Sequence, residues 1–181
     1  MKIKGTLITF LIASIICSSN LVNAADIKPL NNRTRNEIKL YNYMLFPINR
    51  SSTLKQALAL HNGSPANDCV YFVSQTLRNT ILSVPLYVNT TSELVNYLTS
   101  KGWTRGKNWN NLAKGDICFT TGDYKGNPTH SYIFMSWVNK TFTYANICDN
   151  QSYQYGTILH KRSFNFATPT KEACAFFMHS N

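Results

Sequence analysis

Apolar residues in the first part of the chain recur at helical spacing. Ile38, Tyr41 and Leu45 lie three or four positions apart, and this pattern predicts a helix over residues 34–45. The same periodicity, together with residues that favour the N-cap position, predicts three further helices. They follow Ser52, Asp68 and Ser92 and end near residues 61, 81 and 101.

Beyond residue 115 the pattern changes to short segments rich in β-branched and aromatic residues, each bounded by polar loops. These segments predict five strands, at residues 116–121, 131–138, 141–148, 156–162 and 173–179. The helices therefore precede an antiparallel sheet, and this segregation indicates the α+β class.

The N-terminus has the pattern of a secretory signal peptide. Lys2 and Lys4 precede an apolar run over residues 7–17, and a cleavage site follows at Val22-Asn23-Ala24. The run is shorter than the roughly 20 apolar residues that a membrane-spanning helix needs. Ile16 stands before Cys17, where a lipid-modified cysteine would need a small residue. We therefore expect removal of residues 1–24, export to the periplasm or the cell exterior, and no membrane span in the mature protein.

Composition narrows the classes of function. Eighteen Lys and Arg against eight Asp and Glu give a formal charge of +10, which becomes +8 on the 157 residues left after signal removal. The basic residues form no compact cluster and no nucleic-acid-binding module is recognisable, so nucleic acid is not an expected partner. The Cys and His residues lack the spacing of a zinc site, and we expect neither a metal nor another cofactor.

Four of the five cysteines remain in the mature chain, and export places them where disulfides can form. Cys69, Cys118, Cys148 and Cys174 could pair in three ways. A chain of this length can support its own core without disulfides. If Cys69 is reactive instead, one candidate pairing is Cys148 with Cys174, with Cys118 buried and free.

Cys69 has the context of a reactive thiol. It follows the N-cap candidate Asp68 and opens an amphipathic helix, whose partial positive charge at the N-terminus would stabilise a thiolate. The alternative is a structural role, as a small buried residue or as half of a disulfide. Position alone gives the two interpretations about equal weight.

His130 is the candidate general base, at the start of a predicted strand. A two-residue turn at residues 139–140 would set His130 opposite Asp149, on the same face of the hairpin. A three-residue turn would put Asn150 there instead, and Asn146 would face the opposite side. A carboxylate beside the imidazole would orient it and stabilise its charged form.

A Cys at a helix N-terminus, packed on a sheet that presents His and a polar partner, is the arrangement of papain-like thiol catalysis. The run Asp68-Cys69-Val70-Tyr71-Phe72-Val73-Ser74-Gln75-Thr76-Leu77 resembles the nucleophile motif of NlpC-type and CHAP-type cell-wall peptidases and amidases. It is most similar to an amidase branch of that superfamily. Residues 102–103, 112–116 and 129–132 follow in the family's order, and the resemblance covers residues 65–150. Lys114 departs from the family, which usually has Pro at this position.

This resemblance implies a papain-like catalytic domain over residues 65–181, with residues 25–64 as a helical segment packed on it. Cys69 matches the nucleophile and His130 the base, and Asp149 stands where such families place a third polar residue. The implied activity is cleavage of amide bonds in bacterial peptidoglycan or its peptide fragments, by an endopeptidase or an amidase.

The resemblance leaves the remaining polar and aromatic residues to be assigned. We expect Asp68, Trp103 and Tyr124 to contact substrate, and His160 and His179 to be structural. Trp109, Tyr153 and Tyr155 could line the same groove, or could simply cover the edges of the core.

Two other interpretations stay open. The chain could be an exported binding protein that keeps the fold without turnover. It could also be a thiol hydrolase or transferase toxin directed at a host or a competitor, and an inhibitor or immunity protein would then be a partner. A disulfide at Cys69, or failure of Cys69 to react with an alkylating agent, would favour the binding protein.

Overall fold

The computed structural model describes residues 32–121 and 126–181. The predicted signal peptide and Tyr124 lie outside these residues. In chain order the helices are α1 (Asn32–Leu45), α2 (Pro47–Leu60), α3 (Cys69–Arg78), α4 (Thr91–Ser100) and α5 (Ser152–Tyr155). The strands are β1 (Thr104–Gly106), β2 (Ile117–Thr121), β3 (Pro128–Trp137), β4 (Tyr144–Cys148), β5 (Leu159–Ser163) and β6 (Cys174–His179).

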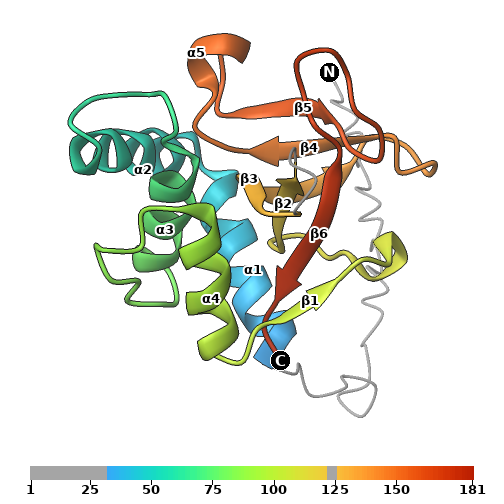
Figure 1. Cartoon of the computed structure of the whole chain (residues 1–181), viewed down its shortest axis with the longest axis horizontal. Coiled ribbons are helices and arrows are strands. Elements are labelled where there is room, and N and C mark those ends of the chain that lie inside the picture. The colour runs from blue at the N-terminus through green and yellow to red at the C-terminus, as the bar shows by residue number, and fades with distance from the viewer. Residues whose placement is uncertain (1–31, 122–125) are drawn as a thin grey trace, which may run out of the picture.

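The six strands form one antiparallel sheet in the order β1-β6-β2-β3-β4-β5. Helices α1 to α4 gather on one side of this sheet, as Figure 1 shows, and α1, α3 and α4 all contact β3. The predicted α+β class with an antiparallel sheet is therefore confirmed. No helix in the described part of the chain is long and apolar enough to cross a membrane.

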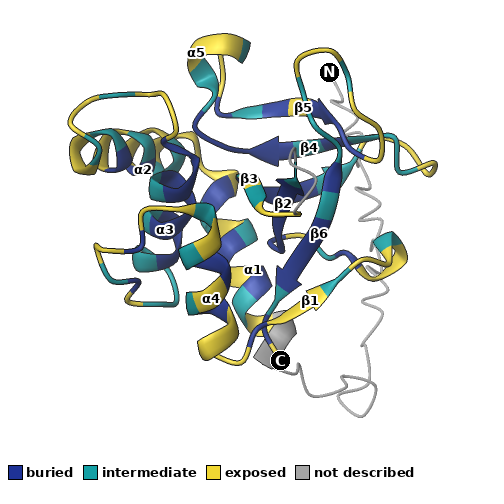
Figure 2. Ribbon diagram, viewed as in Figure 1, coloured by how far each residue is buried: buried dark blue, intermediate teal, exposed yellow. Residues whose placement is uncertain are grey.

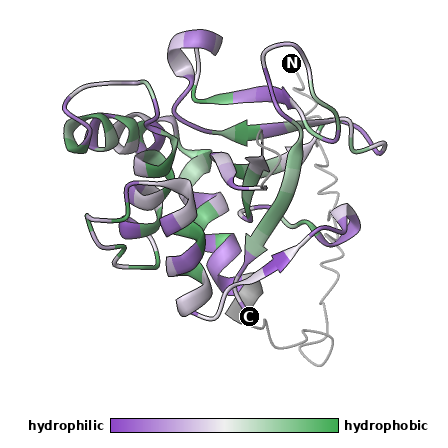
Figure 3. Cartoon of the chain, viewed as in Figure 1, coloured by the Kyte–Doolittle hydropathy of each residue, from purple (hydrophilic) through white to green (hydrophobic). Residues whose placement is uncertain are grey.

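The two faces of the sheet carry separate hydrophobic clusters. The helix-facing cluster joins strand residues such as Ile117 and Ile133 to Phe72 of α3. The cluster on the opposite face contains Cys118, which follows Ile117 in β2, and Tyr132, which precedes Ile133 in β3. This alternation follows from the two-residue period of a strand, which sends successive side chains to opposite faces. Buried positions and apolar residues coincide along the central strands in Figures 2 and 3.

Helices α2 and α4 begin earlier than predicted, as α1 does by two residues. Helix α2 starts at Pro47 rather than after Ser52, because proline fits the first helical position, where its missing N–H costs nothing. Helix α4 is capped by Thr90 rather than Ser92. The Thr90 side chain accepts from the Glu93 N–H, and the Glu93 carboxylate accepts from the Thr90 N–H, so both orphan donors are satisfied.

The hairpin of β3 and β4 also differs from the prediction. A two-residue turn at residues 139–140 is wrong: β4 begins only at Tyr144, and the Val138 N–H donates to the Tyr144 carbonyl. The pairing sets Ile133 opposite Cys148, and its register shifts between Phe134 and Ser136. The sheet also gains β1, whose three residues are too few to show an alternating pattern.

The candidate disulfide between Cys148 and Cys174 is wrong. Cys148 belongs to the helix-facing cluster and Cys174 to the opposite one, so the sheet separates their side chains. All four cysteines of the described residues are free and buried.

Helix α1 is held closely against the rest of the fold. Gly115 has φ +93°, and a Cβ at this position would lie 2.1 Å from the carbonyl oxygen of Glu37 in α1. The Glu37 carboxylate in turn accepts hydrogen bonds from the backbone N–H and hydroxyl of Ser180. Only glycine permits this close approach, which brings α1 onto the turn before β2.

Candidate active site

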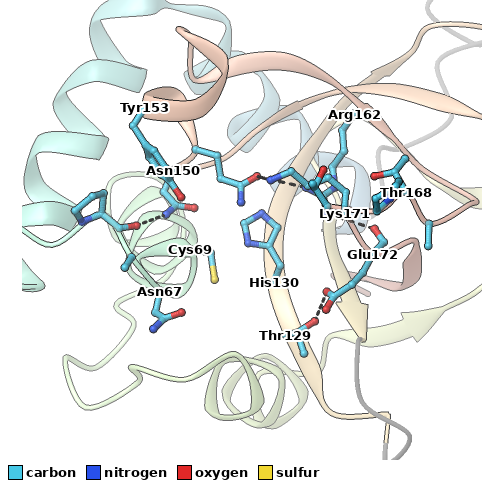
Figure 4. A pocket seen from close by; sticks show the side chains of 16 residues that line it. Asn67, Cys69, Thr129, His130, Asn150, Tyr153, Arg162, Thr168, Lys171 and Glu172 are labelled. Atoms are coloured by element: carbon cyan, nitrogen blue, oxygen red, sulfur yellow. Dashed lines mark hydrogen bonds between the residues drawn. The ribbon is translucent and has the colours of Figure 1, made fainter.

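Cys69 is the first residue of α3 and lines a cavity of about 550 Å³. Three segments build the cavity: the loop before α3, the start of β3, and the loops that flank β5. Figure 4 shows Cys69 and His130 side by side in it. The lining residues are Pro65, Ala66, Asn67, Cys69, Thr129, His130, Asn150, Gln151, Tyr153, Arg162, Ala167, Thr168, Pro169, Thr170, Lys171 and Glu172.

The structure brings Cys69, His130 and Asp149 together at the cavity. His130 Nε2 lies 2.9 Å from Asp149 Oδ2, and the same imidazole is close enough to the Cys69 thiol to lower the pKa of that thiol. Because Asp149 occupies Nε2, the other ring nitrogen, Nδ1, is left for the thiol. The carboxylate is fully buried, which fixes the orientation of the ring.

Asp149 reaches His130 by a route that the two-residue turn did not predict. The observed register pairs Ile133 with Cys148, so the next position would set Asp149 opposite Tyr132 rather than His130. His130 and Tyr132 are two residues apart on the same face, and diagonal neighbours across a strand pair lie within reach of long side chains. The other two candidates have different partners: Asn146 donates to Ser136 and Asn150 to the Pro65 carbonyl.

The electrostatics of this site favour a charged pair of thiolate and imidazolium. Burial raises the pKa of Cys69, but the hydrogen bond with His130, its charge and hydrogen bonds with Ser131 outweigh burial and lower that pKa below its ordinary value. Burial lowers the pKa of His130, but Asp149 and Cys69 more than offset it and raise that pKa to about 9. Both shifts favour an ionised Cys69 beside a protonated His130 over the neutral pair.

A second layer of contacts holds Asp149. Its Oδ1 accepts from the Gln151 N–H at 2.8 Å, and His160 Nε2 lies 3.8 Å from the same oxygen. The His160 ring stacks on Tyr155 at 3.8 Å between centroids. His160 therefore packs behind the Asp149 carboxylate, a position that depends on strand pairing and that its own sequence context does not reveal.

The N-terminus of α3 offers donors for a developing oxyanion. The first N–H groups of any helix have no acceptor within the helix. With Cys69 at the first helical position, its own N–H belongs to this set and lies at the nucleophile. This geometry suits an amide carbonyl attacked by the thiolate.

The three predicted substrate contacts have different outcomes. Asp68 is fully buried, makes no cap hydrogen bond and does not line the cavity; its Oδ1 lies 3.7 Å from His61 Nδ1. Trp103 is buried in the helix-facing cluster, also away from the cavity. Tyr124 lies outside the described residues. Of the other loop aromatics, Tyr153 lines the cavity and is mostly exposed.

Sequence reasoning missed the cavity wall formed by Arg162, Lys171 and Glu172. These residues come from β5 and the loop before β6, far along the chain from Cys69. Charged residues scattered through a basic sequence carry no local pattern, so only the fold could bring them to the site.

Comparison with protein-family models, with curated proteins and with solved structures gives no match to this chain. Within residues 32–121 and 126–181, no group of three or more His, Cys, Asp or Glu side chains could hold a metal ion.

Proposed function

We propose that the protein is an exported cysteine hydrolase with a papain-like catalytic arrangement, which cleaves amide bonds of bacterial peptidoglycan. The observation that carries the proposal is that Cys69 and His130 line one cavity, with His130 hydrogen-bonded to the buried carboxylate of Asp149. The choice of peptidoglycan rests on the resemblance of the Cys69 motif to cell-wall peptidases and amidases. Both an endopeptidase and an amidase fit this site.

The first half of the reaction transfers the acyl group to sulfur. The Cys69 thiolate attacks the amide carbonyl carbon, an S–C bond forms, and the carbonyl electron pair moves to the oxygen, next to the N–H groups at the start of α3. When the oxyanion collapses, the C–N bond breaks and protonated His130 gives its proton to the leaving nitrogen. The products are a thioester on Cys69 and a free amine.

The second half returns the enzyme to its starting state. Neutral His130 takes a proton from water as the water oxygen attacks the thioester carbon. The C–S bond breaks, the carboxylic acid leaves and the thiolate is restored beside protonated His130. Asp149 holds the ring through both halves and stabilises its charged form.

The test is incubation of the protein with purified peptidoglycan, followed by mass analysis of released fragments. We expect fragments from the wild type and a loss of cleavage of at least about 10³-fold in Cys69→Ala, because the nucleophile is removed. The matched control is Cys118→Ala, which removes a buried thiol that is not in the cavity. Equal cleavage by Cys69→Ala and wild type would refute the mechanism.

The fragments also separate the remaining possibilities. New amino groups inside the peptides, with the first stem residue still attached to the glycan, identify an endopeptidase, whereas release of intact stem peptides from the glycan identifies an amidase. If the wild type releases nothing, the exported binding protein and the toxin acting on another target become the better hypotheses.

A further inference from the structure

The cavity wall beyond His130 carries two cationic side chains that the proposed mechanism does not use. Arg162 of β5 is 3% exposed, and Lys171 lies in the loop between β5 and β6. Both line the same cavity as Cys69 and His130. Figure 4 shows them on the other side of His130 from Cys69.

The buried guanidinium of Arg162 has only neutral acceptors among the described residues. One terminal nitrogen donates to Gln151 Oε1 at 3.4 Å and the other to the Glu172 carbonyl at 3.3 Å. Its Nε has no hydrogen-bond partner, and no carboxylate of the described residues forms an ion pair with it. A buried cation is costly unless an anion pairs with it, so this site has unused capacity for a negative group.

Lys171 adds a second cation at the same place. Its Nζ donates to Gln151 Oε1 at 2.9 Å and to Gln154 Oε1 at 2.7 Å. The Gln151 oxygen thus accepts from both Lys171 and Arg162. Burial, and after it the charge of Arg162, lowers the pKa of Lys171, although the charge of Asp149 acts in the opposite direction.

The carboxylate that lines this side of the cavity, Glu172, is hydrogen-bonded elsewhere. Glu172 Oε2 accepts from the hydroxyls of Thr120 and Thr129 at the lower edge of the cavity in Figure 4, although the charge of Arg162 still lowers the pKa of Glu172. Among the described residues Arg162 and Lys171 therefore have no directly bonded carboxylate, and a bound anion could take that place.

We propose that Arg162 and Lys171 bind a carboxylate of the substrate, on the leaving-amine side of the scissile amide. His130 protonates the leaving nitrogen, so the amine part of the substrate lies beside His130 and extends toward these two residues. The planar fork of an arginine suits a carboxylate, and a lysine adds a second point charge. This inference rests on the proposed function and narrows its substrates to amides whose amine product carries a free carboxylate.

The first test compares two Lys→Met variants in the peptidoglycan assay. Lys171→Met removes a charge from the cavity, whereas Lys161→Met removes the same charge from an exposed neighbour of Arg162 outside the cavity. We expect Lys171→Met to raise KM about tenfold with little change in kcat, since a charge-assisted hydrogen bond is lost. Lys161→Met should leave both unchanged, and equal KM values in the two variants would overturn the inference.

The same assay can remove the charge from the substrate instead. A carbodiimide and ammonia convert the carboxylates of peptidoglycan to amides. Use of this amidated substrate should raise KM for the wild type and make little further difference to KM for Lys171→Met. This non-additivity identifies Lys171 and a substrate carboxylate as partners. An amidated wall cleaved as well as the native one would contradict the proposal.

A second experiment does not depend on peptidoglycan cleavage. Iodoacetate and iodoacetamide differ by one carboxylate, and the ratio of their rates with Cys69 measures the attraction of an anion into the cavity. Lys171→Met should lower this ratio by about fivefold and Lys161→Met should not. If the wild type cleaves no peptidoglycan, the proposed function fails, and this ratio alone decides whether the anion site exists. An unchanged ratio in Lys171→Met refutes the anion site.

Discussion

Two buried carboxylates are associated with Cys69: Asp68 is its neighbour in the chain, and Asp149 is linked to it through His130. Their surroundings differ sharply. Asp149, directly after β4, is hydrogen-bonded through both oxygens, to His130 and to the Gln151 N–H. Asp68, directly before Cys69 in the chain, makes no hydrogen bond with any described residue through either oxygen. Both side chains are fully buried. The difference between them is therefore one of partners and not of exposure.

The partners decide the charge of each group. Burial alone raises the pKa of Asp68 to about 7, since nothing offsets it. Burial acts on Asp149 in the same direction, but the hydrogen bond and charge of His130, with smaller contributions from His160 and Gln151, lower the pKa below its ordinary value. Asp149 is thus a fixed negative charge at neutral pH, while Asp68 exchanges its proton near neutrality.

The two groups also affect folding stability with opposite signs. The pKa of Asp149 is lower in the folded protein than in the unfolded chain, so its stabilisation is present above the unfolded pKa and is lost as the pH falls. The pKa of Asp68 is higher in the folded protein. Its folded state is therefore favoured at low pH and loses stability as the pH rises from about 4 through about 7.

The largest expected difference between the two carboxylates is in catalysis. Asp149→Asn should lower kcat/KM for wall cleavage by about 10² to 10⁴, because the imidazolium loses its charged partner and the ring its preferred tautomer. Asp68→Asn makes the same chemical change outside the cavity and should lower kcat/KM far less. Comparable losses in the two variants would mean that Asp149 acts only through the fold.

Sequence patterns predicted most of this fold because each element carries a local signal. In the described part of the chain, the period of apolar residues identifies the four long helices and five of the six strands. The position of Cys69 at the start of α3 follows from Asp68 before it and the amphipathic residues after it. Element ends were less predictable. Helix α2 starts at Pro47 and helix α4 is capped by Thr90, whereas Ser52 and Ser92 are equally good caps by residue type, because short-range cap chemistry allows several starts.

The sequence predicts only those features of the site that depend on residues close together in the chain. Asp149 was proposed from a hairpin register that the structure does not have, and it meets His130 diagonally because the loop is longer and the strand pairing shifts after Phe134. Nothing in the sequence linked Arg162 or Lys171 to Cys69, since their meeting depends on the path of β5 and the loop after it. Residue type alone places Trp103 in a groove, whereas the structure buries it in the helix-facing cluster.

The next difference concerns the proton on His130. Asp149 raises the pKa of His130, so Asp149→Asn should lower it from about 9 by about one to two pH units. NMR titration of the His130 ring protons measures this directly, without any need for turnover. The alkaline limb of the pH profile of kcat/KM should move down by the same amount, because only protonated His130 can donate to the leaving nitrogen.

The matched variant makes this titration specific. Asp68→Asn should leave the His130 titration where it is, since Asp68 is not among the groups that shift it. A His130 pKa that stays near 9 in Asp149→Asn would show that Cys69 alone sustains the imidazolium.

The smallest expected effect is a gain in stability from Asp68→Asn. Above pH 7 the wild type must bury an ionised carboxylate without a hydrogen bond, whereas asparagine fills the same volume without a charge. Urea unfolding at pH 8 should therefore give a free energy of unfolding about 1 to 3 kcal/mol higher for Asp68→Asn. Below about pH 4 Asp68 carries a proton in the folded and in most of the unfolded protein, so the two proteins should then differ little.

The same substitution at Asp149 should destabilise the protein at pH 8, because it removes the buried charge that pairs with His130. If Asp68→Asn destabilised the protein equally at pH 8 and below about pH 4, the Asp68 carboxylate would have to be held by its neighbour His61, and the contrast between the two buried carboxylates would disappear.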